Sequence, residues 1–227
     1  MTTVRAAISW SAGKDSCLAL LHARETGWQV DDFFTMCESN GDSKSHALPP
    51  DLIAAQVAAL GGIWHQVCVP EGEANAYARC LDEVLCQLKV HGCTHIVFGD
   101  IDLAAHRDWL VPRCAALGLE AAFPLWGLSR TALAEEIVRR GVRARLVCVD
   151  AGRLDPAFCG RDYDARLLAE LPAGVCPCGE DGEFHTFVLG APGMAPLAVE
   201  NGPVERVASR PPFLPTEFVF QRLRRTG

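Results

Sequence analysis

Short apolar segments alternate with longer amphipathic segments along the first half of the chain. The apolar segments have the length of buried parallel strands, and the others have helical periodicity, with Leu18, Leu21 and His22 on one face. Gly27 and Gly92 follow two of the helical segments, as is typical of helix ends. The pattern predicts strands at residues 4–9, 33–37, 63–69 and 94–98, and helices at residues 15–26, 50–60, 73–91 and 102–117.

Strands and helices that alternate in this order predict an α/β fold with a doubly wound parallel sheet. The pattern is less regular after residue 118. It predicts helices at residues 131–140 and 163–170, and strands at residues 144–149, 187–189, 198–207 and 218–223. We therefore predict two domains, residues 1–125 and a smaller α+β domain of residues 126–227.

Composition and charge narrow the functional classes. Hydrophobic residues make up 49% of the chain, which favours a packed core over disorder. The net charge of −7 argues against a nucleic-acid-binding protein, which needs a basic face. Residues 1–16 have no long apolar stretch of the signal-peptide type, and no apolar run has membrane-spanning length. We expect a cytoplasmic protein without a membrane partner, whose eleven cysteines are reduced thiols.

The segment Ser11-Ala12-Gly13-Lys14-Asp15-Ser16 connects the first predicted strand to the first predicted helix. Its small residues let the backbone approach a polyphosphate, and a helix N-terminus supplies N–H groups and partial positive charge. Lys14 adds a full charge. The segment is not a Walker A loop, because Asp15 follows the lysine, and the chain has no Gly-x-Gly-x-x-Gly. We predict a phosphate-binding loop here.

This segment resembles the Ser-Gly-Gly-Lys-Asp-Ser loop of the pyrophosphate-loop ATPases, which belong to the adenine nucleotide alpha hydrolase class of Rossmann-like folds. Those enzymes cleave ATP between the α and β phosphates. Ala12 stands where the first glycine of that loop usually lies. A methyl group is tolerated there if the backbone torsions of Ala12 are ordinary.

Four further segments resemble the diphthine–ammonia ligase family, also called diphthamide synthetase. They are residues 43–49 (Ser-Lys-Ser-His-Ala-Leu-Pro), residues 99–109 with Gly-Asp-Ile at their start, residues 124–127 (Pro-Leu-Trp-Gly) and residues 178–187 (Cys-Gly-Glu-Asp-Gly-Glu-Phe-His-Thr-Phe). The resemblance runs from about residue 8 to residue 189, and the last segment is its most specific part. It implies a ligase that uses ATP to convert a carboxylate into an acyl-adenylate, which ammonia then converts into an amide.

The resemblance also implies roles for particular residues, with ATP and Mg²⁺ as the expected cofactors. The expected catalytic residues are Lys14, Asp15, Asp100, Glu180 and Glu183, with Asp15 as a ligand of the magnesium ion. The expected nucleotide-binding residues are Ser9, Ser11, Ala12, Gly13, Lys14, Asp15, Ser16, Met36, His46 and Gly99. The expected acceptor-binding residues are His106, Arg107, Trp126, Gly182, His185 and Thr186, whereas Cys178 is expected only to pack.

The acceptor of the family is diphthine, a modified histidine of elongation factor 2, so that factor is an expected partner together with ammonium. The chain has no room for a glutaminase domain beside the ATP domain, which favours free ammonium as the nitrogen source. A homo-oligomer stays open. Two other functions also stay open: a pyrophosphate-loop enzyme acting on a different carboxylate or small molecule, and an ATP-binding protein without turnover. Simpler roles stay open as well: helix capping for Asp15 and Asp100, packing for Trp126, and solvated positions for His46, Glu180 and Glu183.

Overall fold

The computed structural model describes residues 3–44, 46–209 and 215–226, and the chain divides into two compact units. Unit 1 consists of Met1–Ser11 and Asp15–Leu128, and unit 2 of Ala12–Lys14 and Ser129–Gly227. The central residues of the predicted phosphate loop thus group with the C-terminal half of the chain. The fold prediction is confirmed, because unit 1 carries a parallel sheet flanked by helices and unit 2 a smaller antiparallel sheet.

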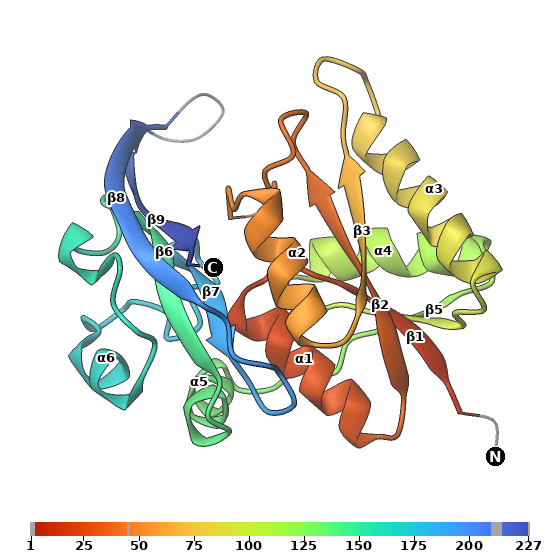
Figure 1. Ribbon diagram of the computed structural model, residues 1–227, viewed down its shortest axis with the longest axis horizontal. Helices are drawn as coiled ribbons and strands as arrows, with labels where there is room; N and C mark the ends of the chain where they lie inside the picture. Colours follow the sequence, from red (N-terminus) through yellow and green to blue (C-terminus); the bar gives the residue numbers. More distant parts are fainter. Residues whose placement is uncertain (1–2, 45, 210–214, 227) are drawn as a thin grey trace. The chain divides into compact units, whose positions relative to one another are not determined.

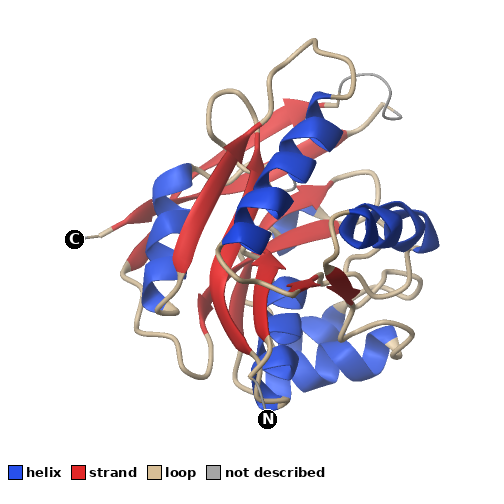
Figure 2. Cartoon of the chain, turned by 90° about the vertical axis from the view of Figure 1, so that its right-hand side faces the viewer, coloured by secondary structure: helices blue, strands red, loops and turns tan. Residues whose placement is uncertain are grey.

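The described residues of unit 1 form a five-stranded sheet in the order β3-β2-β1-β4-β5, with all neighbouring strands parallel (Figures 1 and 2). Successive strands move outward from β1 first on one side and then on the other, which is the Rossmann-like order. The strands are β1 (Arg5–Ser9), β2 (Gln29–Cys37), β3 (Ile63–Cys68), β4 (His95–Val97) and β5 (Glu120–Ala122). The helices are α1 (Lys14–Glu25), α2 (Pro50–Ala59), α3 (Ala76–Val90) and α4 (Ala104–Ala116).

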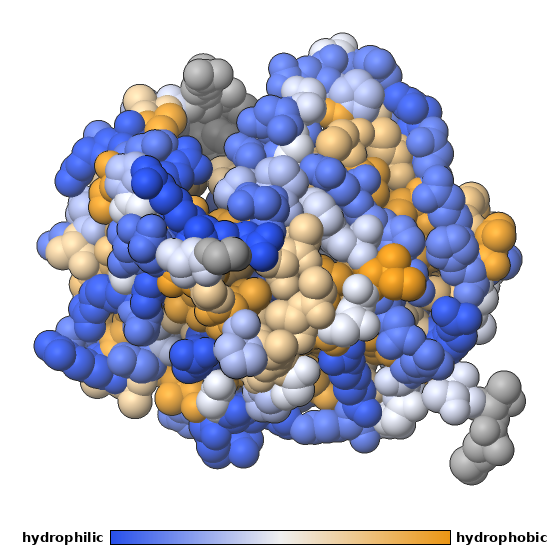
Figure 3. All heavy atoms as spheres, in the orientation of Figure 1, coloured by the Kyte–Doolittle hydropathy of each residue, from blue (hydrophilic) through white to orange (hydrophobic). Residues whose placement is uncertain are grey.

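Helices cover both faces of this sheet. One core cluster joins the buried sides of α3 and α4 to the strand residues Phe34 and Ile96 and to Phe98, which directly follows β4. Side chains alternate between the faces of a strand, so Phe33 points to the other face, where α1 and α2 lie in front of the sheet in Figure 1. The side of α3 that faces away from the sheet carries polar residues. Figure 3 shows mainly hydrophilic atoms where α3 lies in the view of Figure 1.

Two strands of unit 1 differ from the prediction for identifiable reasons. β2 begins at Gln29, four residues before the predicted start, because Asp31 and Asp32 interrupt the apolar pattern although they belong to the strand. Asp32 is buried and paired with His65, so a polar residue occupies a core position. The short strand β5 was not predicted, since its three residues carry too little pattern to distinguish it from a loop.

The described residues of unit 2 form a four-stranded antiparallel sheet in the order β7-β6-β9-β8. Its strands are β6 (Arg143–Asp150), β7 (Phe184–Gly190), β8 (Val199–Ala208) and β9 (Glu217–Arg225). The helix α5 (Arg130–Arg139) lies beside α6 (Ala165–Glu170), and a 3-10 turn, η1, covers Pro156–Phe158 (Figure 1). Strand β7 begins three residues earlier than predicted. The end of the segment at residues 178–187, which we call the late family-like segment, is therefore part of the sheet.

None of the helices in the described ranges has both the length and the apolar character that crossing a lipid bilayer requires.

Candidate active site

The carboxyl ends of β1 and β4 mark the position in unit 1 where the strand order reverses. Open α/β sheets bind ligands at this position, because the connections after the two central strands run in opposite directions and leave a crevice. The predicted phosphate loop follows β1, and Gly99 and Asp100 follow β4. The topology therefore brings two of the predicted site segments to one edge of the sheet. Ser9, the last residue of β1, also lies at this edge.

Gly99 allows β4 to approach the first turn of α1. A Cβ atom at this position would lie 3.0 Å from the backbone nitrogen of Ser16 and 3.2 Å from the carbonyl carbon of Asp15. Such contacts are too close for a side chain, so only glycine fits without a shift of the backbone. The hydroxyl oxygens of Ser11 and Ser16 lie 3.0 Å apart, which closes the loop within unit 1.

Asp15 lies in the first turn of α1, which begins at Lys14. The carboxylate is stabilised there by the partial positive charge of the helix N-terminus. It is partly exposed, in contrast to the buried Ser16 beside it. Its Oδ1 atom is buried, so the other carboxylate oxygen is the one that can face a cation near the loop.

Of two further predicted residues, Met36 lies next to the last residue of β2, and His46 belongs to the segment that follows this strand. The carbonyl of Met36 accepts a hydrogen bond from the backbone of Lys44 at 3.0 Å, so the chain folds back onto the end of its strand. The hydroxyl of Ser43 accepts a further bond from the backbone of Leu48 at 3.1 Å. His46 therefore lies in a hydrogen-bonded loop beyond the carboxyl end of β2.

Asp100 is hydrogen-bonded to His106, with 2.9 Å between Oδ1 and Nδ1. The helix α4 starts at Ala104 with Leu103 at the cap position, so the alternative role of Asp100 as a helix cap is wrong. Burial, followed by the nearby charge of Asp100, raises the pKa of Tyr77. Asp100 is thus a partly buried carboxylate whose orientation is set by His106.

Arg107 and Trp126 form one contact in unit 1. The guanidinium carbon of Arg107 lies 4.8 Å from the centre of the Trp126 ring, a cation–π distance. The ring also lies edge-on to Phe123, with 5.8 Å between centroids. Arg107 and Trp126, both predicted to bind the acceptor, are therefore in contact with each other. The contact of Trp126 with Phe123 also fits the simpler alternative, in which Trp126 is a packing residue.

In unit 2, the phosphate loop is bonded to strand β7. The backbone N–H of Lys14 donates to the hydroxyl of Thr186 at 3.1 Å, and the carbonyl of Ala12 accepts from the backbone N–H of Val188 at 3.0 Å. Ala12, Gly13 and Lys14 are all buried. The structure thus joins the loop to the late family-like segment, although the two are far apart in sequence.

The side chain of Lys14 is buried in unit 2, with 2% of its surface exposed. Its ammonium group donates a hydrogen bond to the carbonyl of Cys178. The nitrogen also lies 5.6 Å from the centre of the Tyr163 ring and 5.5 Å from that of Phe184. A carbonyl oxygen and two ring faces all favour a cation, so they compensate part of the cost of burying the charge.

Glu183 organises the turn that carries Cys178. Its two carboxylate oxygens accept hydrogen bonds from the backbone N–H groups of Cys176 at 2.8 Å and Asp181 at 3.1 Å. Its side chain is buried, whereas Glu180 on the same turn is partly exposed. The two predicted catalytic glutamates therefore differ in environment: one holds the turn together, and the other lies closer to solvent.

Further contacts tie this turn to the rest of unit 2. The hydroxyl of Tyr163 donates to the carbonyl of Pro177 at 2.7 Å, and the thiol of Cys178 donates to the carbonyl of Arg130 at 3.0 Å. Gly182 has a positive φ of 87° and donates its N–H to the carbonyl of Gly179 at 3.1 Å, which closes the turn. The carbonyl of Cys178 is thereby held in the position from which it accepts the ammonium hydrogen bond.

Ala12 has a φ of 67°, in the left-handed region that favours glycine. The backbone torsions of Ala12 are therefore not ordinary, and the condition under which a methyl group is tolerated here without strain is not met. In this conformation the carbonyl of Ala12 accepts the hydrogen bond from the backbone N–H of Val188 on β7, a residue far away in the sequence. The loop keeps its conformation with an alanine at the cost of backbone strain.

His185 lies beside Thr186 on β7 and is partly buried. Burial, and secondarily the charge of Lys14, lowers the pKa of its imidazole from 6.5 to about 4. Both causes disfavour an additional proton. His185 is consequently neutral at physiological pH.

For three residues near Lys14, the sequence predicted no functional role. They are Cys178, which acts through its backbone carbonyl, and the aromatic residues Tyr163 and Phe184. Carbonyl groups leave no mark on residue identity, and aromatic residues near strands are usually core residues. Only the position of Cys178 at the start of the late family-like segment could have indicated its involvement.

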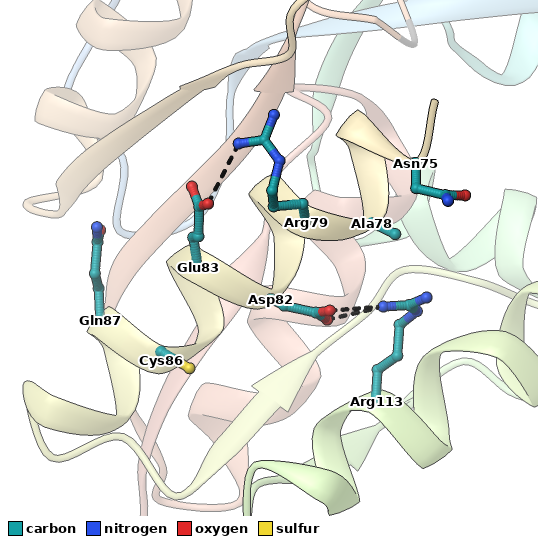
Figure 4. Close-up of a pocket in the computed structure, with 8 residues that line it drawn as sticks. All are labelled: Asn75, Ala78, Arg79, Asp82, Glu83, Cys86, Gln87 and Arg113. Atoms are coloured by element: carbon teal, nitrogen blue, oxygen red, sulfur yellow. Dashed lines mark hydrogen bonds and ion pairs between the residues drawn. The ribbon is translucent and has the colours of Figure 1, made fainter. Parts of the chain in front are cut away.

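Figure 4 shows a different hollow, on the outer side of α3 and α4 in unit 1. It is crossed by ion pairs between Arg79 and Glu83 and between Asp82 and Arg113. None of the eight residues that line it is a predicted site residue.

The fold and the loop define a Rossmann-like α/β protein with a strand–loop–helix segment at the position where the strand order reverses. Family comparison identifies its class more closely. The model of the diphthamide synthase N-terminal domain matches residues 4–121, and that of the diphthamide synthase C-terminal domain matches residues 129–199. The chain belongs to the diphthamide synthase family. Membership of this family implies ATP-dependent amidation. A search among curated proteins returned no match.

Proposed function

We propose that the protein is an ATP-dependent carbon–nitrogen ligase that activates a carboxylate as an acyl-adenylate and converts it into an amide with ammonia. One observation carries the proposal: Lys14 of the phosphate loop is bonded to Thr186 and Cys178 of the segment most specific to the family. A lysine held in this way is oriented before any ligand binds, which is what stabilising a developing charge requires.

The phosphate loop binds the polyphosphate of ATP. The N-terminus of α1 favours anions, and the small residues Ser11, Gly13 and Ser16 allow close approach. The ammonium of Lys14 has three N–H donors, one of which is directed at Cys178. Ser9, Ala12, Met36, His46 and Gly99 complete the proposed nucleotide-binding set.

The residues present fit a magnesium ion. Asp15 and Asp100 are oxygen donors that follow β1 and β4, and the close approach at Gly99 brings the backbones of these two segments together. Mg²⁺ typically binds one or two carboxylates together with phosphate oxygens. When bound, the ion would neutralise negative charge on the phosphates.

Activation joins a carboxylate oxygen of the acceptor to the α-phosphorus of ATP, and the bond to pyrophosphate breaks. Negative charge then accumulates on phosphates that are already charged. Lys14 and the N-terminus of α1 offset this charge. The nitrogen of ammonia next attacks the acyl carbon, AMP leaves, and the nitrogen loses a proton to form the amide.

The late segment acts in the second step. Glu180, the more exposed of the two glutamates, orients ammonia and accepts its proton, whereas Glu183 holds the turn in place. His185 is neutral and can accept a hydrogen bond without repelling Lys14. The proposed acceptor-binding residues of unit 2 are Gly182, His185 and Thr186, and those of unit 1 are His106, Arg107 and Trp126.

The proposed acceptor is diphthine on elongation factor 2, and the nitrogen comes from free ammonium. This reaction would take place in the cytoplasm, where translation factors act. The net charge of −7 suits a protein substrate better than a nucleic acid.

The decisive experiment identifies the nucleotide product. The purified protein is incubated with labelled ATP, Mg²⁺ and ammonium, with and without elongation factor 2 that carries diphthine. AMP and pyrophosphate formed only when ammonium and the factor are both present, together with a one-to-one yield of amide, would support the proposal. AMP formed with another carboxylate would retain the chemistry and reject diphthine. Bound ATP that never yields AMP would reject the ligase.

A further inference from the structure

Three potential metal ligands meet in unit 1 beside β2 and β3. Asp32 is a residue of β2, His65 is a residue of β3, and His91 follows the last residue of α3. Asp32 pairs with Ile63 and His65 pairs with Phe34, so Asp32 and His65 are diagonal neighbours on adjacent strands. One ligand atom from each residue lies within 4.8 Å of the others.

The two imidazoles converge on one oxygen of the carboxylate. Oδ1 of Asp32 lies 2.8 Å from Nε2 of His65 and 3.8 Å from Nδ1 of His91. Ligands in a tetrahedral zinc site, each about 2.0–2.1 Å from the metal, are roughly 3.3 Å apart. The two observed distances lie on either side of this value. The two imidazole nitrogens lie within 4.8 Å of each other. Binding one ion therefore requires shifts of about half an ångström relative to Asp32 and an approach of the two histidines by at most about 1.5 Å.

The other oxygen of the carboxylate has its own neighbours. Oδ2 of Asp32 accepts a hydrogen bond from the thiol of Cys93 at 3.7 Å, and a guanidinium nitrogen of Arg5 lies 3.9 Å away. These contacts orient the carboxylate and leave Oδ1 directed at the histidines. The side chain of Arg5 is nearly half exposed, so water screens its repulsion of a cation.

The surroundings favour a cation that enters from solvent. Asp32 has 3% of its side chain exposed, and a buried carboxylate requires a compensating partner. His91 is the C-cap residue of α3, where the helix dipole contributes partial negative charge. About half of its side chain is exposed, which provides a path for an ion.

We propose that Asp32, His65 and His91 form a binding site for a divalent transition metal of the zinc class, with water as the fourth ligand. Two imidazoles and one carboxylate are typical ligands for Zn²⁺, whereas Mg²⁺ prefers oxygen ligands alone. None of its three residues belongs to the proposed nucleotide, magnesium or acceptor sites, so the site does not depend on the proposed reaction. A bound ion links β2, β3 and the end of α3.

The test uses the full-length protein without nucleotide, after removal of metal by a chelator. Zn²⁺ binding is followed by calorimetry, and Co²⁺ serves as a spectroscopic probe because tetrahedral cobalt has intense visible bands. We expect roughly one ion per chain, with cobalt bands typical of nitrogen and oxygen ligands that Zn²⁺ abolishes. Zn²⁺ should also raise the Tm.

Variants determine whether the ion occupies this site. His91→Ala changes a half-exposed residue at a helix end and should fold, yet it should weaken Zn²⁺ binding by about 100-fold or more. Asp32→Asn should have a similar effect. The matched control, His22→Ala, removes a histidine of α1 in the same unit and should leave affinity unchanged. Absence of Zn²⁺ binding, or binding that His91→Ala does not weaken, would overturn the proposal. In the latter case thiols elsewhere would hold the ion, and the Asp32–His65 contact would be an ordinary buried hydrogen bond.

Discussion

The backbone N–H of Lys14 donates a hydrogen bond to the hydroxyl of Thr186, a residue 172 positions further along the chain. Together with the bond from the Lys14 ammonium to the carbonyl of Cys178, it joins both ends of the lysine to the late family-like segment. The residue with the strongest expected catalytic role thus depends on that segment for its position. Changes to either should affect the same step.

Replacement of Lys14 should impair formation of AMP far more than folding. Lys14→Met keeps an unbranched chain between the rings of Tyr163 and Phe184 but removes the charge. We expect kcat for AMP formation to fall about 100-fold or more, the usual cost of losing one preorganised donor. Single-turnover assays with labelled ATP measure the effect, and Lys14→Ala should be at least as severe.

Lys89→Ala is the control, because this lysine lies in the last turn of α3 and is distant from the loop in sequence. It should retain wild-type turnover. Circular dichroism should show folded protein for all three variants. Wild-type AMP formation by Lys14→Met would remove the phosphate loop from the mechanism.

Glu183→Gln should loosen the turn that holds Cys178. An amide nitrogen cannot accept the hydrogen bond from either Cys176 or Asp181, so one buried backbone N–H loses its partner, at a cost of about 1–3 kcal/mol. We expect ATP to bind, whereas the amide-forming step slows. Equilibrium binding of ATP and amide yield should be measured on the same preparation. If ATP binding alone is lost, the late turn serves the nucleotide and not the acceptor.

Gly99→Ala should disturb the approach of β4 to α1. The added methyl would lie 3.0 Å from the nitrogen of Ser16, and backbone cannot yield as a flexible side chain does. We expect a loss of about 1–3 kcal/mol in the free energy of unfolding and weaker ATP binding. Gly202→Ala is a suitable control, since its nearest neighbour would be 3.3 Å away. Equal losses in both variants would show that the contact at Gly99 has no special importance.

Ala12→Gly should be tolerated and should stabilise the protein slightly. Glycine adopts the left-handed conformation of Ala12 without the steric cost, although the unfolded chain gains entropy, so the net gain is at most about 1 kcal/mol. Denaturant unfolding measures the change. Ala12→Val provides the contrast, because a branched side chain in this conformation should destabilise the protein. A marked loss of stability in Ala12→Gly would mean that the buried methyl group matters more than the strain.

The parallel sheet could be predicted from the sequence because its signals are local. Each buried strand is a short apolar run, and each helix carries its own periodicity. The loop that ends in Ser16 could be located because residue types and position in the strand–helix pattern agree. Asp32 marks the limit of this reasoning, since a buried carboxylate inside a strand is explained by partners that are distant in sequence, such as His65 and Cys93.

Other features of the candidate site were beyond prediction for a similar reason. The role of the Cys178 carbonyl depends on a turn held by Glu183, and the conformation of Ala12 depends on its bond to Val188. These contacts connect residues far apart in sequence and involve backbone atoms that every residue has. Residue types indicated the chemistry of the segment, whereas the contacts that orient it arise only from folding.

The lowered pKa of His185 predicts that stability depends on pH in the acidic range. Its pKa is about 4 in the folded protein and about 6.5 when unfolded, so below pH 6.5 the unfolded chain binds the additional proton first. The contribution of this histidine is fully present above pH 6.5 and is lost as the pH falls toward 4. It amounts to about 3 kcal/mol at most.

His185→Gln removes the titrating group while keeping a polar side chain on β7. The free energy of unfolding should therefore fall less between pH 7 and pH 4.5 in this variant than in the wild-type protein. The difference should be up to about 3 kcal/mol. Denaturant titrations at the two pH values measure it. Identical slopes for the wild type and His185→Gln would show that the imidazole gains its proton in the folded state as readily as in water. His185 would then be charged over part of the working range and would repel Lys14 beside it.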